Sequence, residues 1–175
     1  MKRLVKKAKQ GDKEALMQLV LAAKDDYYRL AYTYVENEHD AMDALENMIV
    51  ILYEKMDQLQ NPESFYSWSK TILVNECRAI LRKRKKVVFL DEQQAVQIVD
   101  EKTVEATDEL TFNELLTSLS PVQKEAVQMR YLLDYDYETI ATLTNVPVST
   151  AKSRVFHALK NLRKTLGGEK GEGAR

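Results

Sequence analysis

The expected fold of this chain is decided by residues 119–166, which read LSPVQKEAVQMRYLLDYDYETIATLTNVPVSTAKSRVFHALKNLRKTL. Ser120-Pro121 predicts a helix start, because a proline in the first helical turn loses no helical hydrogen bond. The apolar spacing predicts helices over 121–133 and 137–143, and Asn145-Val146-Pro147 predicts a tight turn before the last helix. Two helices joined by such a turn indicate a helix-turn-helix motif.

The last helix of this stretch combines an apolar stripe with a polar face. The stripe consists of Ala151, Val155, Ala158, Leu159, Leu162 and Leu166. The residues outside it are Thr150, Lys152, Ser153, Arg154, Phe156 and His157. Arg and Lys reach guanine edges or phosphates and Phe contacts a thymine methyl, so this face is predicted to read a DNA major groove. A solvated helix face also exposes Lys and Arg, but the turn and the two flanking helices favour DNA.

The rest of the chain is also expected to be helical. Gly11 is the only glycine before residue 167, and the three prolines stand singly, so little interrupts helix formation. Gly11-Asp12 should end a basic N-terminal helix and cap the next one. Residues 36–40 read as a polar turn that ends in a helix cap, with Asp40 as the last residue of the turn. Longer helices are expected over 41–59 and 64–86. The second should end in a basic cluster and pack through Phe65, Trp68, Ile72, Leu73 and Ile80.

The formal charge of −1 hides an uneven distribution along the 175 residues. Residues 1–86 carry 16 Lys/Arg and 13 Asp/Glu, residues 87–109 carry 1 and 7, and residues 110–175 carry 9 and 7. The sequence therefore predicts an all-α protein of two small helical domains, 1–86 and 110–166, joined by an acidic flexible linker over 87–109. Residues 87–90 carry a strand-like alternative, and the tail 167–175 is expected to be disordered.

An enzymatic role has little support in the sequence. His39 and His157 stand far apart outside any metal-ligand spacing, and no glycine-rich phosphate loop is present. Cys77, the only cysteine, is expected to be structural and excludes an intramolecular disulfide. We therefore expect no catalytic residues, no metal and no cofactor. Without a signal-peptide pattern or a long apolar run, the chain is expected to be cytoplasmic.

The C-terminal stretch resembles region four of bacterial sigma factors of the extracytoplasmic-function (ECF) group, within the sigma-70 family. The matching residues are Leu119-Ser120-Pro121, Met129-Arg130-Tyr131, Tyr137-Glu138-Thr139-Ile140-Ala141 and Thr150-Ala151-Lys152-Ser153-Arg154-Val155. Alone, this stretch also fits other helix-turn-helix proteins such as response-regulator output domains.

The N-terminal half resembles region two of the same family. Tyr28-Arg29-Leu30-Ala31-Tyr32, Asp40-Ala41-Met42-Asp43 and the spacing Trp68…Ile72…Asn75…Arg82 match it. Two motif sets in the right order are far more specific than either alone. The chain departs from the family pattern at Glu46-Asn47, where Gln-Glu is common, and at Ser69 and Ala151, where Leu and Val are usual.

The resemblance implies a sigma factor that binds core RNA polymerase and directs transcription initiation at a class of promoters. It implies that region four reads the duplex element near minus thirty-five and region two holds the melted element near minus ten. The implied DNA-binding residues of region two are Lys70, Asn75, Arg78, Arg82, Lys83 and Arg84. The implied polymerase-binding residues are Asp40, Asp43, Glu46 and Asn47.

The resemblance also implies partners: the β′ clamp helices and the β flap of the polymerase, promoter DNA, and an anti-sigma factor, often membrane-anchored. Two alternatives remain at this stage. One is a stand-alone helix-turn-helix regulator that does not recruit polymerase. The other is a helical adaptor that mimics sigma surfaces.

Overall fold

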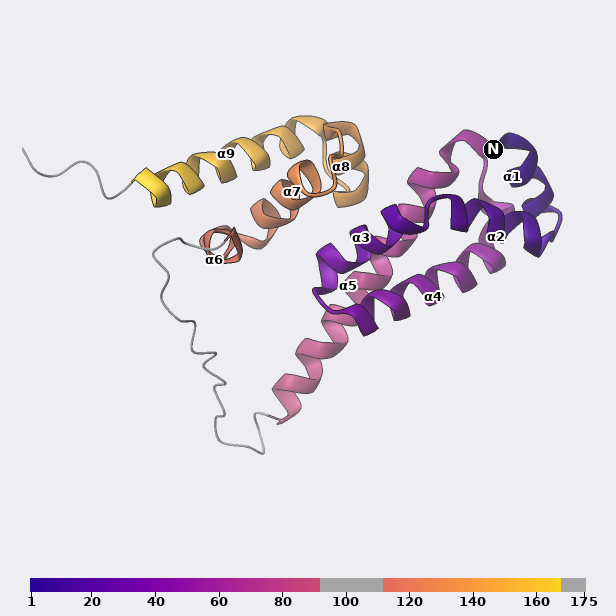
Figure 1. Cartoon of the computed structure of the whole chain (residues 1–175), viewed down its shortest axis with the longest axis horizontal. Coiled ribbons are helices and arrows are strands. Elements are labelled where there is room, and N and C mark those ends of the chain that lie inside the picture. The colour runs from indigo at the N-terminus through magenta and orange to yellow at the C-terminus, as the bar shows by residue number, and fades with distance from the viewer. Residues whose placement is uncertain (92–111, 168–175) are drawn as a thin grey trace, which may run out of the picture. The chain divides into compact units, whose positions relative to one another are not determined.

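The computed structural model describes residues 1–91 and 112–167, and within these ranges the chain is helical with no strand (Figure 1). The chain divides into two compact units, Met1–Ala95 and Val96–Arg175. The predicted all-α fold class is confirmed. Most of the predicted acidic linker and almost all of the predicted disordered tail lie outside the described residues.

Residues 1–91 of the first unit form five α-helices and two short 3-10 turns. They are α1 (Lys2–Lys9), α2 (Lys13–Ala22), α3 (Lys24–Val35), α4 (Glu38–Lys55), η1 (Met56–Gln58), η2 (Pro62–Ser64) and α5 (Phe65–Asp91). The core lies where α3, α4 and α5 pack on one another, and it includes the buried side chains of Leu30, Met48, Leu52 and Leu73.

Side-chain caps fix where two of these helices begin. The Asp12 carboxylate accepts a hydrogen bond from the Ala15 N–H at 3.0 Å, as its place before α2 predicted. For α4 the predicted start was wrong, because Asn37 rather than Asp40 is the cap and accepts from the Asp40 N–H at 3.0 Å. The helix therefore begins at Glu38, and Asp40 lies inside its first turn.

Helix α5 differs from the prediction in its buried stripe and in its length. Phe65 and Leu73 are fully buried as predicted, and Ser69 and Cys77 continue the same stripe at intervals of four residues. The other predicted core residues, Trp68, Ile72 and Ile80, are only half-buried. The helix also continues to Asp91, so the strand-like interpretation of residues 87–90 was wrong. No Pro or Gly separates these residues from the basic helix before them, and β propensity is a weaker signal than that continuity.

A buried hydroxyl pair joins α3 to α5. The Tyr27 and Ser69 side chains are both fully buried, and their oxygens lie 2.6 Å apart. The Ser69 hydroxyl also donates to the Tyr66 carbonyl at 3.1 Å, which leaves Tyr27 as the donor to Ser69. Burial raises the pKa of Tyr27 above its ordinary value. The phenol therefore stays neutral and serves as a hydrogen-bond donor inside the core.

The second unit contains α6 (Phe112–Thr117), α7 (Pro121–Tyr131), α8 (Tyr137–Thr144) and α9 (Val148–Gly167). Part of its core is formed by Leu116, Leu119, Val127 and Ala158, with Leu162 packed against them. The Asp136 carboxylate caps α8 by accepting from the Thr139 N–H at 2.7 Å. Asn145 ends α8 in the left-handed conformation, with φ of 53°.

The turn between α8 and α9 is the predicted one, but the apolar stripe of α9 ends earlier than predicted. Leu166 is 61% exposed. Helix α9 has 20 residues and α7 has 11, so the last turns of α9 extend past the helix that covers its stripe.

The buried hydroxyl pair predicts an asymmetric effect on stability. Ser69→Ala should lower the free energy of unfolding by about 2 kcal/mol, because it leaves the buried Tyr27 O–H without an acceptor. Tyr27→Phe should cost only about 1 kcal/mol, because Ser69 still donates to the Tyr66 carbonyl. Urea titration followed by circular dichroism measures both, with Tyr32→Phe on the exposed side of α3 as a neutral control. A larger loss for Tyr27→Phe than for Ser69→Ala would contradict the assigned donor order.

Candidate DNA and polymerase interfaces

Helix α9 presents the residues that were predicted to read DNA. Ala151, Val155 and Ala158 face the core and are buried. The remaining positions leave Lys152, Ser153, Phe156 and His157 exposed and Thr150 and Arg154 half-buried. The structure therefore brings all six predicted residues onto the first three turns of one helix, directly after the Asn145–Pro147 turn.

The aromatic side chains of this face are arranged for contact outside the unit. Phe156 is 64% exposed, more than any other large apolar side chain within residues 1–85 and 115–166. Its ring meets the His157 ring edge to face, with centroids 5.5 Å apart. The exposed Phe156 ring lies on the same face as His157 and two cations, Lys152 and Arg154. Such a face suits the DNA major groove, which presents thymine methyl groups and hydrogen-bond acceptors.

Two cations lie against the Tyr137 ring at the start of α8, a cluster that was not predicted from the sequence. The Arg130 guanidinium of α7 lies 5.2 Å from the ring centroid and the Lys152 ammonium lies 5.7 Å from it. Arg130 also donates to the Tyr135 carbonyl at 2.9 Å. Cation–π attraction holds a long side chain in one place. Tyr137 therefore positions Lys152, and only the folded arrangement of three helices reveals this.

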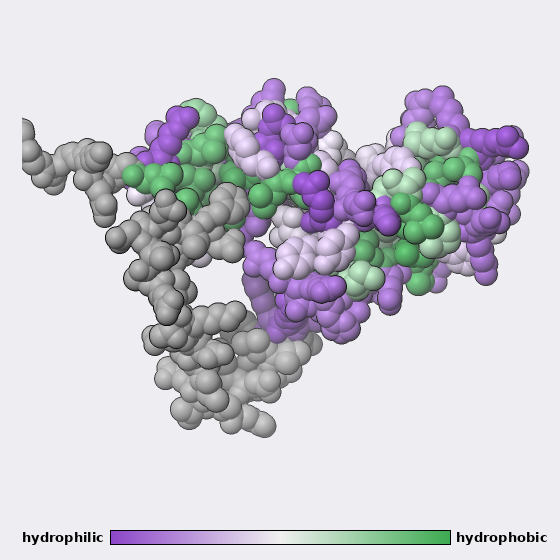
Figure 2. Space-filling model, in the orientation of Figure 1, coloured by the Kyte–Doolittle hydropathy of each residue, from purple (hydrophilic) through white to green (hydrophobic). Residues whose placement is uncertain are grey.

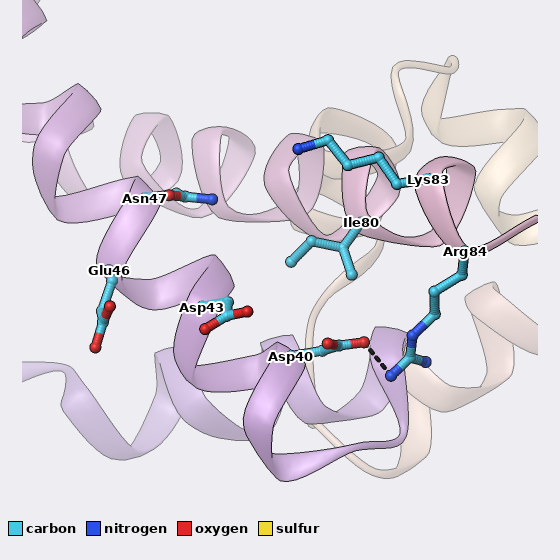
Figure 3. A pocket seen from close by; sticks show the side chains of 7 residues that line it. All are labelled: Asp40, Asp43, Glu46, Asn47, Ile80, Lys83 and Arg84. Atoms are coloured by element: carbon cyan, nitrogen blue, oxygen red, sulfur yellow. Dashed lines mark ion pairs between the residues drawn. The ribbon is translucent and has the colours of Figure 1, made fainter. Parts of the chain in front are cut away.

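A groove between α4 and α5 contains all four predicted polymerase-binding residues (Figure 3). Its volume is about 610 Å³. The lining residues are Asp40, Asp43, Glu46 and Asn47 of α4 and Ile80, Lys83 and Arg84 of α5. The α4 side of the groove is therefore mainly acidic. The α5 side consists of two cations and the apolar side chain of Ile80.

One ion pair crosses this groove. The Arg84 guanidinium contacts the buried Oδ2 of Asp40, and it also donates to the Val35 carbonyl at the end of α3 at 3.2 Å (Figure 3). The Asp40 side chain is only 15% exposed. A residue predicted to bind polymerase is therefore paired with one predicted to bind DNA. Both are engaged within the unit, while Asp43 is half-buried and Glu46 and Asn47 are exposed.

The other predicted residues of α5 fall into two groups. Lys70 is largely buried and its ammonium lies 2.6 Å from the Asp26 carboxylate, so this cation is occupied inside the unit. Arg78 is half-buried with its guanidinium 5.8 Å from the centroid of the Tyr34 ring. Asn75, Arg82 and Lys83 are exposed. Asn75, Arg78 and Arg82 are three and four residues apart and therefore share one side of the helix.

Cys77 has no reactive character. It is fully buried, and burial raises the pKa of its thiol to about 12, so the thiol is protonated at neutral pH. Within residues 1–91 and 112–167, no group of three or more His, Cys, Asp or Glu side chains is placed to hold a metal ion. In the same ranges no helix is long and apolar enough to cross a membrane.

Comparison with known families assigns each unit separately. The family description "Sigma-70 region 2" matches residues 19–87, and "Sigma-70, region 4" matches residues 110–162. Both matches are to parts of bacterial transcription initiation factors. The two helical units thus define the class of protein: a two-region sigma-70 factor with a helix-turn-helix in its second region.

Whole-chain relatives place it within that class. The chain is 31% identical to RNA polymerase sigma factor SigV of Bacillus subtilis over 90% of this chain and 94% of the relative. It is 26% identical to ECF RNA polymerase sigma factor SigW of the same organism over 94% and 96%. The chain belongs to the extracytoplasmic-function sigma factors, which direct RNA polymerase to promoters.

Two solved structures share the fold. CnrH, in complex with the cytosolic domain of CnrY, has a TM-score of 0.67 at 17% identity and covers 97% of this chain and 98% of its own. The sigma factor RpoE, in complex with the anti-sigma factor NepR from Bartonella quintana, has a TM-score of 0.65 at 24% identity and covers 86% and 96%.

The ion pair predicts a specific pattern of stability losses. Arg84→Met should cost about 2 kcal/mol, because it leaves the buried Asp40 carboxylate unpaired; the full penalty for a buried pair is reduced by the partial exposure of Arg84. Adding Asp40→Asn should restore more than half of the loss. Lys83→Met, at the exposed neighbouring position, should change stability by less than about 0.5 kcal/mol. Urea unfolding of the four proteins measures this, and equal losses for Arg84→Met and Lys83→Met would rule the pair out as a structural link.

Proposed function

We propose that this sigma factor docks on core RNA polymerase through the outward face of α4. The support is its mixed character: Glu46 and Asn47 are exposed beside the exposed apolar side chains of Met42, Val50 and Tyr53. Figure 2 displays hydrophobic residues among the hydrophilic surface in the part of the first unit that contains α2 and α4. Apolar side chains surrounded by charged ones are typical of a protein-binding surface.

The α4 surface is expected to meet the clamp helices of the β′ subunit, with Asp43, Glu46 and Asn47 as the polar contacts. Asp40 takes a different role in this proposal, since its carboxylate is buried against Arg84. It shapes the groove and does not meet the partner directly. The second unit is expected to meet the β flap.

Helix α5 is proposed to hold the melted minus-ten strand. Asn75, Arg78 and Arg82 share one side, with Lys83 exposed beside them. Amide and guanidinium groups suit unstacked base edges and phosphates. Lys70 and Arg84 are left out of this contact set, because each is engaged by a carboxylate within the unit.

Helix α9 is proposed to read the duplex minus-thirty-five element. The supporting observation is the set of exposed side chains Lys152, Ser153, Phe156 and His157 after the helix-turn-helix turn, flanked by Thr150 and Arg154. We assign residues 1–86 and 110–166 as the two functional domains. A stand-alone regulator would need only α9, so the α4 face is what favours a polymerase-dependent factor.

An anti-sigma factor is a proposed third partner. The sigma factor RpoE and CnrH were each solved with a bound partner, NepR and the cytosolic domain of CnrY respectively. By analogy, a membrane-anchored anti-sigma factor would cover the α4 face and hold this protein inactive in the cytoplasm. The protein itself would act without catalysis.

Polymerase docking is tested by charge reversal on α4. Glu46→Arg should weaken binding to core polymerase by about tenfold, or 1.4 kcal/mol, because it changes the sign of an interface charge. Glu14→Arg, on the exposed side of α2, is the matched control. Fluorescence anisotropy of the labelled sigma factor with core enzyme measures both, and transcription from a promoter library follows.

The three functional classes give different results in that experiment. A sigma factor binds core enzyme and initiates at selected promoters. Duplex binding without any core binding would replace the proposal with a stand-alone regulator, and the absence of all DNA binding would replace it with an adaptor.

Positioning of Lys152 by Tyr137 is tested on a promoter duplex recovered from that library. Tyr137→Leu should weaken duplex binding about threefold to tenfold, because the ammonium loses its place on the ring. Tyr137→Phe keeps the ring and should bind within about twofold of the parent. In a Lys152→Ala background the Leu variant should have little further effect. Equal losses in the two backgrounds would mean that Tyr137 acts independently of Lys152.

A further inference from the structure

Helix α1 carries a concentration of positive charge that the sigma regions leave unassigned. Five of its eight residues are Lys or Arg and none is acidic. The match to sigma-70 region 2 begins only at residue 19, after α1 has ended. Such a concentration of positive charge suits the binding of an anion.

The helix is a fixed part of the first unit. Val5 and Ala8 are buried, and α1 contacts α2, η1 and η2. The Lys9 ammonium donates to the Leu59 carbonyl at 2.7 Å, and the Lys2 ammonium lies 2.6 Å from the Glu63 carboxylate. Two cations therefore fasten α1 to the segment 56–64, which leads into α5.

The other three cations of α1 do not link the helix to another segment. Arg3, Lys6 and Lys7 are exposed, and none has an ion pair or hydrogen bond with another described side chain. Arg3 stands three residues from Lys6 and four from Lys7, spacings at which like charges on a helix repel each other. The helix dipole favours Lys6 and Lys7 in the last turn but opposes Arg3 in the first. A bound anion would relieve this repulsion.

The position of α1 indicates which anion it is. Figure 1 places α1 beside the start of α5, in agreement with its contacts to η2. On α5, Asn75, Arg78 and Arg82 form the proposed strand-binding side. A single strand that follows α5 toward its N-terminal end would reach α1. We propose that Arg3, Lys6 and Lys7, the α1 patch, bind backbone phosphates of the promoter strand beyond the end of α5.

This proposal rests on the proposed strand-binding role of α5 only for the path of the strand. Phosphate binding here needs charge and no base readout, so it should be independent of sequence and sensitive to salt. The α1 patch would extend the grip on an opened promoter without changing which promoter is chosen.

The test measures binding of the full chain to a fluorescein-labelled oligothymidine of about 20 nucleotides over a range of salt concentrations. Lys6→Gln with Lys7→Gln should lower the slope of log affinity against log salt by about 1.4, since each single-strand phosphate contact contributes roughly 0.7. Gln keeps helix propensity close to that of Lys, and circular dichroism checks that the fold is intact.

Two controls separate local contact from net charge. Lys24→Gln with Lys55→Gln removes the same charge from exposed ends of α3 and α4 and should leave the slope within about 0.3 of the parent. Lys6→Arg with Lys7→Arg keeps the charge and should bind like the parent. Equal slopes for the two Gln pairs would overturn the α1 patch.

A third Gln pair distinguishes this proposal from the proposed function. If Arg82→Gln with Lys83→Gln weakens strand binding and the α1 pair does not, the α1 patch fails while the role of α5 stands. If the α1 pair alone weakens it, the patch stands and the role of α5 fails. A loss of core polymerase affinity with unchanged strand binding would assign the patch to an acidic protein surface and overturn the phosphate proposal.

Discussion

The Asp40–Arg84 ion pair is the interaction on which the arrangement of the first unit depends. Arg84 lies in the C-terminal half of α5. Its guanidinium contacts Asp40 in the first turn of α4 and donates to the carbonyl of Val35, the last residue of α3. A buried carboxylate is costly unless it is paired, so other alignments of α4 against α5 would leave Asp40 without its cation. The pair thereby fixes the groove whose rims carry the proposed polymerase and DNA contacts.

The cationic side chains of this unit fall into two groups, those with a partner inside the unit and those exposed at its surface. Lys2, Lys9, Lys70 and Arg84 have intramolecular partners and hold segments together. Arg82 and Lys83 on α5, and the α1 patch, remain exposed. A count of basic residues cannot make this division, because the partners come from other helices. Net charge near zero is therefore compatible with strongly cationic local surfaces.

The sequence predicted the features that depend on local rules. The Asp12 cap, the Asn145 turn and the stripe Ala151–Val155–Ala158 follow from neighbours within one helical turn, and all three are confirmed. The predicted start of α4 was wrong because Asn37 and Asp40 are both favourable cap residues, and only the folded structure shows that Asn37 is the cap. The ion pairs of Lys70 and Arg84 and the cations on Tyr137 join residues far apart in the chain, which periodicity cannot detect.

Ser69 illustrates how a departure from a family pattern becomes intelligible only in three dimensions. The resemblance to the family pattern favoured Leu at this position, and a serine in a buried stripe looks unfavourable. Its hydroxyl accepts from the Tyr27 phenol and donates to the Tyr66 carbonyl, so both of its hydrogen-bonding roles are used. A leucine would leave the phenol O–H buried without a partner, at a cost of about 1–3 kcal/mol. Ser69 and Tyr27 therefore form one unit of the core, and a substitution at either position has to be judged together with the other.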